Sequence, residues 1–122
     1  MKISKLLAAA AVCCAVSSGA WAAGAIAVDD EEGTSARDAG YGIAVGKKTR
    51  EDAAAAAMEA CREEGNKSCR VAVRFDVCGA YAANKKVYGV GWGDTEAAAK
   101  RKAMDECGET SCKIVISGCD DD

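Results

Sequence analysis

Two stretches of the chain have nearly the same order of residue types. "YGIAVGKKTREDAAAAAMEAC" covers residues 41–61, and "YGVGWGDTEAAAKRKAMDEC" covers residues 88–107. A Gly-Ala pair precedes each stretch, and two further cysteines follow each one. Because similar sequences adopt similar structures, we expect one domain made of two repeats, at about residues 24–78 and 79–119. An internally duplicated domain of this kind is expected to have pseudo-two-fold symmetry.

Each repeat predicts the same series of elements. A short apolar strand comes first, then a strand with period-two alternation, an alanine-rich helix and a third strand. Thr49 is placed to cap the first helix, either Asp94 or Thr95 the second, and Gly65 and Gly108 to end them. The sequence therefore predicts an α+β domain with a strand-strand-helix-strand unit used twice. We expect two helices on one face of an antiparallel or mixed β-sheet.

The strand before each helix has one bulky face and one small face. The bulky faces consist of Tyr41, Ile43 and Val45 in one repeat and Tyr88, Val90 and Trp92 in the other. The alternate positions hold glycine or alanine, and each helix has a matching stripe of small residues. Glycine within a strand is typical of a close approach by another backbone. We infer that the helices pack closely on the small faces.

Tyr41, Tyr88 and Trp92 are the candidate binding residues. If the helices cover the glycine faces, these aromatic side chains lie on the opposite face of the sheet as a partly exposed patch. Aromatic residues are enriched where proteins bind partners. The alternative is that they form the main core and that the helices pack against them, since the chain has few other aromatic residues. Both arrangements remain open at this point.

The first 22 residues have the features of a cleaved signal peptide. Lys2 and Lys5 precede an apolar run, and the small-residue site Ala20-Trp21-Ala22 follows it. No other stretch is apolar enough to span a membrane. We therefore expect residues 23–122 to form a single exported domain, periplasmic or secreted, which ends in an acidic tail.

Six cysteines remain after this cleavage, which is typical of a disulfide framework in a small exported domain. The chain has no histidine and no Cys-x-x-Cys pair, so the pattern favours disulfides over zinc. Six cysteines allow ~15 pairings. From the repeat we predict Cys61–Cys69 and Cys107–Cys112 at the helix ends, and Cys78–Cys119 between the two halves.

The doubled pattern resembles an exported bacterial family, the domain of unknown function 4189. The resemblance rests on "CGAYA" and "YGVGWGDTEAAAKRKAMDEC" and extends from Gly24 to Cys119. It implies export and the fold, and it brings no catalytic residues.

The remaining features indicate binding rather than catalysis. No histidine can act as a general base, and "GVGWGD" has Asp94 where a dinucleotide-binding loop needs glycine. The acidic run 29–32 lacks the pattern of an EF-hand loop, and the small basic spots, Lys47-Lys48 and Lys85-Lys86 among them, are expected to be solvated surface. We expect no enzyme activity, cofactor, metal site or nucleic-acid partner.

The expected function is therefore that of a binding module for a protein or glycan at the envelope or outside the cell. The alternative is an enzyme inhibitor or immunity-type protein.

Overall fold

The computed structural model describes residues 22–31 and 33–121, so the predicted signal peptide lies outside the described residues except for Ala22. Each half contains two strands, a helix and a third strand, in the order that the sequence predicts. The elements are β1 (Ala23–Asp29), β2 (Gly40–Lys47), α2 (Arg50–Glu63), β3 (Arg70–Phe75), β4 (Cys78–Ala83), β5 (Tyr88–Gly93), α3 (Glu96–Cys107) and β6 (Lys113–Cys119).

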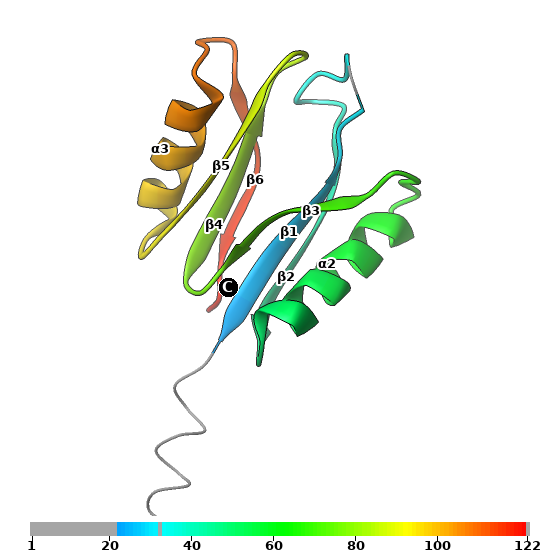
Figure 1. Cartoon of the computed structure of the whole chain (residues 1–122), viewed down its shortest axis with the longest axis vertical. Helices are drawn as coiled ribbons and strands as arrows, with labels where there is room; N and C mark the ends of the chain where they lie inside the picture. Colours follow the sequence, from blue (N-terminus) through cyan, green and yellow to red (C-terminus); the bar gives the residue numbers. More distant parts are fainter. Residues whose placement is uncertain (1–21, 32, 122) are drawn as a thin grey trace, which may run out of the picture.

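The strands form two three-stranded antiparallel sheets, with the orders β2-β1-β3 and β5-β4-β6. The sheets face each other, α2 covers the outer face of the first, and α3 covers the outer face of the second (Figure 1). The predicted α+β class is confirmed. The difference from the prediction is that each half forms its own sheet with its own helix, where the sequence analysis placed both helices on one sheet. A helix packs on the small face of each sheet, and the bulky faces of the two sheets pack against each other.

The central strands β1 and β4 are buried along nearly their whole length. A helix covers one face of each strand and the opposite sheet covers the other. Because no face meets water, these strands contain only small, apolar or aromatic residues until Asp29, the last residue of β1, and the one aromatic residue is Tyr81 of β4. Strands that are covered on both faces are typically continuous apolar runs of this kind.

The helices lie directly on the glycine faces of β2 and β5, as the sequence predicts. A Cβ atom on Gly42 would overlap the carbonyl oxygen of Ala57, and one on Gly91 would overlap that of Ala99. The stripes that face the strands are buried: Ala53, Ala57 and Cys61 in α2, and Ala99, Ala103 and Cys107 in α3.

The helix ends follow the predicted capping residues. The side-chain oxygen of Thr49 accepts a hydrogen bond from the backbone N–H of Asp52 (3.0 Å), and that of Thr95 accepts one from Ala98 (3.1 Å). Of the two candidates for the second cap, the structure thus uses Thr95. Gly108 ends α3 in the left-handed conformation, with φ of 79°, which favours glycine.

The core between the sheets contains Ile26, Val28, Val73, Phe75, Tyr81 and Ala83. Phe75 is the only phenylalanine of the chain. Its ring occupies the space beside Gly24 of β1 and Gly79 of β4, where a Cβ atom would overlap it. The corresponding Gly-Ala pairs of the two halves therefore make room for one aromatic ring between the central strands.

Three disulfides are formed, Cys61–Cys69, Cys78–Cys119 and Cys107–Cys112, and these are the three pairs that we predict from the sequence. The location of one bridge differs from our expectation. Cys78 ends the first repeat as the sequence divides it, but in the structure it is the first residue of β4 and pairs in register with Cys119 of β6, so this bridge lies within the second sheet. Formed disulfides are compatible with a periplasmic or extracellular protein. Among the residues described, no helix has the length and apolar character needed to cross a membrane.

The contact between β5 and α3 leads to a first prediction. Replacing Gly91→Ala forces the helix away from the strand, and we expect a loss of ~1–3 kcal/mol in the free energy of unfolding, which is the usual cost of overpacking. Gly93→Ala is the matched control in the same strand, because its Cβ would first meet the side chain of Ala98 at 3.2 Å. Urea denaturation compares the two variants. Equal losses would contradict the close helix contact.

The bridges lead to a second prediction. Cys78 and Cys119 are 41 residues apart, and Cys107 and Cys112 are 5 apart. On the chain-entropy model, removing the first pair as a double alanine variant costs ~4 kcal/mol and removing the second ~2 kcal/mol. Thermal unfolding measures the order of the two effects. Peptide mapping without reduction tests the pairing itself, and a peptide that joins Cys61 to Cys107 would show that the pairing is wrong.

Candidate functional site

Three loops gather at the end of the molecule where β1 and β4 finish (Figure 1). They are the β1–β2 connection, the β4–β5 turn and the α3–β6 loop. Between them lies an open groove of about 470 Å³, which we call the basic groove. It is lined by Ser35, Ala36, Arg37, Asn84, Lys85, Lys86, Glu109, Ser111 and Lys113.

Asn84 holds two walls of the groove together. Its side-chain oxygen accepts hydrogen bonds from the backbone N–H groups of Lys86 and Val87, both at 2.8 Å. Its side-chain nitrogen donates to Glu109 (2.7 Å) and Ser111 (3.0 Å). An asparagine that bonds the backbone two residues on is a common way to shape a tight turn. The positions of the β4–β5 turn and the α3–β6 loop are therefore set by one side chain.

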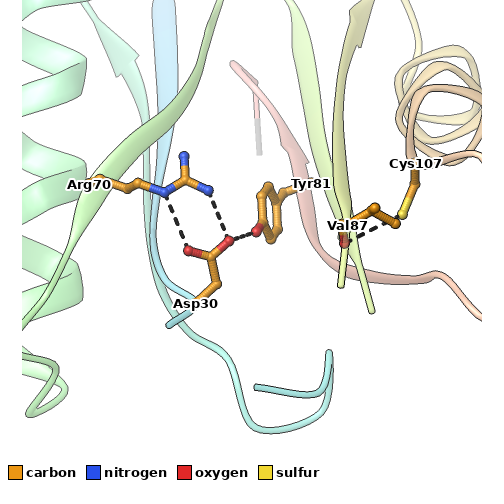
Figure 2. Close-up of polar contacts among 5 residues, drawn as sticks. All are labelled: Asp30, Arg70, Tyr81, Val87 and Cys107. Atoms are coloured by element: carbon orange, nitrogen blue, oxygen red, sulfur yellow. Dashed lines mark hydrogen bonds and ion pairs between the residues drawn. The ribbon is translucent and has the colours of Figure 1, made fainter. Parts of the chain in front are cut away.

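The α3–β6 loop is also tied at both ends. The Cys107–Cys112 disulfide joins the last residue of α3 to the residue before β6. The Sγ atom of Cys107 lies 3.9 Å from the carbonyl oxygen of Val87, so the bridge also contacts the β4–β5 turn (Figure 2). These contacts fix the two walls of the basic groove that the second half supplies, and the β1–β2 connection of the first half supplies the third.

The groove carries an excess of positive charge. Arg37, Lys85, Lys86 and Lys113 are all exposed, and Glu109 is the one acid among the described residues that line the groove. Within residues 22–31 and 33–121, none of the four basic side chains has an acidic partner within salt-bridge distance. The groove therefore has four basic side chains, one acid, and no salt bridge between them in the described part of the chain.

The corresponding place in the first half holds an ion pair. Arg70 pairs in register with Val28 near the end of β1, and Lys113 pairs with Ala83 near the end of β4. Counted from these paired residues, Asp30 lies two positions after Val28, as Lys85 lies two positions after Ala83. The first half thus has an acid and a base at these two positions, whereas the second half has two bases.

Asp30 joins the two halves in a cluster that Figure 2 shows. Its carboxylate accepts two hydrogen bonds from the Arg70 guanidinium, at 3.3 and 2.9 Å, and one from the hydroxyl of Tyr81. The guanidinium also lies over the ring of Tyr88, 4.6 Å from its centroid, and Tyr88 stacks on Tyr81 at 5.7 Å. The side chain of Asp30 is 17% exposed, against 41% for its partner Arg70. With three hydrogen bonds accepted, this carboxylate has a structural role in joining the two halves.

The three aromatic residues predicted to bind a partner are half-exposed. The exposed fractions of Tyr41, Tyr88 and Trp92 are 42, 50 and 49%. The alternative, in which they form the main core, is therefore wrong. The helices pack on the glycine faces of the edge strands β2 and β5, and the three aromatic rings lie on the opposite faces, half-exposed. The three do not line one hollow: Tyr88 belongs to the Asp30 cluster, and Tyr41 and Trp92 lie in separate hollows. A binding role for them stays a prediction.

Trp92 lies at the opposite end of the sheets from the basic groove. It lines a hollow of about 360 Å³ together with Val77, Arg74 and the ion pair of Arg50 with Asp76. The two charges are 2.7 Å apart, and hydrogen bonding from the Arg50 guanidinium holds the pKa of Asp76 below its usual value. Lys102 covers one face of the indole, with its Nζ atom 3.7 Å from the ring centroid. This hollow has balanced charges, in contrast to the basic groove.

Sequence reasoning missed the basic groove because it treated Lys85 and Lys86 as ordinary solvated surface. Arg37 and Lys113 come from distant parts of the chain, and only the fold brings them beside the β4–β5 turn. One signal was present: superposing the repeats places Asp30 against Lys85 and Arg70 against Lys113. That exchange of charge at matched positions marks the site.

The Asp30 cluster leads to a third prediction. Replacing Asp30→Ala leaves Arg70 and the Tyr81 hydroxyl without their partner, and we expect the free energy of unfolding to fall by ~2 kcal/mol. Asp105→Ala removes an exposed acid from α3 and should change it by less than ~0.5 kcal/mol. Urea denaturation of both variants is the measurement. Similar values for the two would mean that the cluster contributes nothing specific.

Comparison with known proteins identifies the chain at the level of a family. No curated protein and no solved structure matches it. One family model matches residues 21–119, nearly the whole described domain, and its description is "Domain of unknown function (DUF4189)". The resemblance noted in the sequence is thereby confirmed, and the chain belongs to this family.

Proposed function

We propose that this domain is a small, exported binding module that takes up an anionic ligand in the basic groove. The observation that carries the proposal is the charge exchange between the halves. Lys85 and Lys113 occupy the positions at which the first half has the Asp30–Arg70 ion pair. Gathering like charges costs free energy. Glu109 lines the groove, and Asp30 and Glu31 line the adjoining hollow with Lys85 and Lys86, but within the described residues no salt bridge neutralises these lysines. A bound anion would supply the counter-charge that Asp30 supplies in the other half.

The lining of the groove suggests the chemistry of the ligand. Lysine and arginine bind carboxylates and phosphates through charge-assisted hydrogen bonds. The hydroxyls of Ser35 and Ser111 add neutral hydrogen-bonding groups beside the charges. The groove is open to solvent along its length, which suits a segment of a larger molecule better than an enclosed small one. We therefore propose an acidic protein or an acidic glycan at the envelope or outside the cell as the partner.

The same features support binding over catalysis. The chain has no histidine, and the six cysteines of the described domain are in disulfides. Glu109, the one carboxylate among the described lining residues, accepts a hydrogen bond from Asn84. General acid–base catalysis needs a group that exchanges a proton near neutral pH. We propose that the groove binds its ligand without transforming it.

One observation favours a second candidate, an inhibitor or immunity-type protein. Lys85 and Lys86 lie in the turn between β4 and β5, and hydrogen bonds from the turn's backbone to the Asn84 side chain fix its shape. A rigid, exposed and positively charged turn could enter the acidic cleft of an enzyme. Stoichiometric loss of a hydrolase's activity on mixing would favour this candidate, whereas saturable binding to an acidic polymer favours the groove.

The test is a titration of the oxidised protein with poly-glutamate and with polygalacturonate, followed by calorimetry. Neutral dextran is the control ligand. We expect saturable binding to an acidic polymer that weakens as salt is added, since screening reduces charge attraction. The double variant Lys85→Glu/Lys86→Glu should lower the affinity by about tenfold or more, or ~1.4 kcal/mol.

The chain provides a matched control in a second lysine pair. Lys47→Glu/Lys48→Glu makes the same change in net charge at the opposite end of the strands and should leave the affinity within about twofold of the parent value. Equal losses in both variants would mean that only net charge matters. Absence of binding to either acidic polymer, at low salt, would count against an anionic ligand of this kind.

A further inference from the structure

The outer edge of β5 is closed by a side chain. β5 is an edge strand, and its Val90 pairs in register with Tyr81 of β4. The backbone N–H of Val90 points away from the sheet and donates to Oε1 of Glu106 on α3, at 3.1 Å. An edge strand with free N–H and C=O groups readily pairs with another strand. Glu106 therefore occupies the place where another strand would add.

The corresponding edge of β2 lacks this cover. Ile43 pairs in register with Ile26 as Val90 does with Tyr81, so its N–H also points away from the sheet. The residue of α2 that corresponds to Glu106 is Ala60, one position before the helix-end cysteine in both halves. A methyl group cannot accept a hydrogen bond. By the alternation of an antiparallel strand, Tyr41 and Val45 present their backbone groups on the same edge.

A hollow of about 560 Å³ lies beside this uncovered edge. Its walls are the first residues of β2 and the C-terminal end of α2, and it is lined by Ala39, Gly40, Tyr41, Gly42, Ile43, Ala60, Glu64 and Asn66. The half-exposed ring of Tyr41 borders it. There is thus space for a strand next to backbone groups that can pair with one.

We propose that the occupant is a second copy of this chain, with the two β2 strands paired antiparallel about a two-fold axis at Ile43. The Ile43 residues of the two copies then exchange hydrogen bonds, and Tyr41 lies opposite Val45 of the second copy. The two sheets that contain β2 become one continuous six-stranded sheet. Two-fold pairing of one surface with itself is the commonest form of association between identical chains.

The charges along β2 favour this partner and this direction. Lys47 and Lys48 lie at the end of the strand, and Glu63 and Glu64 lie at the end of α2, beside the start of the strand. Antiparallel pairing places the lysines of each copy near the glutamates of the other. All four side chains are exposed, and no salt bridge involves them in the described part of the chain.

The expected dimer is weak. One strand edge and two helix ends bury less than the ~1,200–2,000 Å² of total surface that is usual for stable complexes. Association should therefore depend on concentration. This makes sedimentation velocity across a concentration series of the oxidised protein the appropriate measurement.

Ala60→Glu is the decisive variant, because it places on α2 the carboxylate that closes β5 in the other half. We expect the parent chain to shift toward the dimer's sedimentation coefficient as concentration rises, and Ala60→Glu to stay monomeric throughout. Ala55→Glu makes the same substitution on the exposed face of the same helix and should associate like the parent. Circular dichroism confirms that each variant is folded before it is compared.

A charge exchange tests the direction of pairing. Lys47→Glu/Lys48→Glu should reduce association, and adding Glu63→Lys/Glu64→Lys in the same chain should restore it, because each copy then again presents opposite charges to the other. A parent chain that is monomeric at every concentration would overturn the proposal. So would an Ala60→Glu variant that associates as well as the parent. Failure of the charge exchange to restore association would exclude the antiparallel two-fold arrangement.

Discussion

The contact between helix backbones and glycine-bearing strand faces determines the rest of the structure. Because Gly42 and Gly91 have no side chains, α2 and α3 lie directly on their strands. Every larger side chain of β2 and β5 must then point the other way. A sheet with one helix-covered face and one bulky face needs a second apolar surface. The two halves meet that need for each other, and the core between the sheets follows from it.

Sequence patterns predicted the features that depend on neighbouring residues. Alternation in β2 and β5, the alanine stripes of the helices, the cap at Thr49 and a second cap at Asp94 or Thr95 are local, and the structure contains them, with Thr95 as the second cap. The division into two sheets was not predictable in the same way. Period-two alternation shows that a strand has two different faces, but it does not show which surface will cover each one. One sheet with two helices satisfies the same pattern.

The candidate site was less predictable than the fold, because its residues are assembled from separate segments. Arg37, Lys85 and Lys113 are far apart in the sequence and meet only through the loops at one end. Asp30 belongs to an acidic run that composition alone describes as solvated. Its contacts with Arg70 and Tyr81 depend on how the first sheet faces the second. The sequence analysis proposed Tyr41, Tyr88 and Trp92 as binding residues, yet the structure separates them. Tyr41 lies on β2, and Tyr88 and Trp92 lie near opposite ends of β5.

Because the two halves have the same order of elements, each position in one half can be compared with the corresponding position in the other. Where both halves keep the same residue type, as at the glycines beneath the helices, packing alone explains the choice. In other places a charge or a backbone N–H has a partner in one half and, among the described residues, none in the other half. Packing does not explain such a difference, since the same backbone geometry accommodates either residue. Two positions are of this kind: Lys85 stands in place of Asp30, and Ala60 in place of Glu106. The first leaves a lysine without a salt-bridge partner among the described residues, and the second leaves the N–H of a strand edge without the acceptor that Glu106 provides in the other half. Both departures expose a group that a second molecule can satisfy, so the two proposed binding surfaces rest on the differences between the halves and not on the features they share.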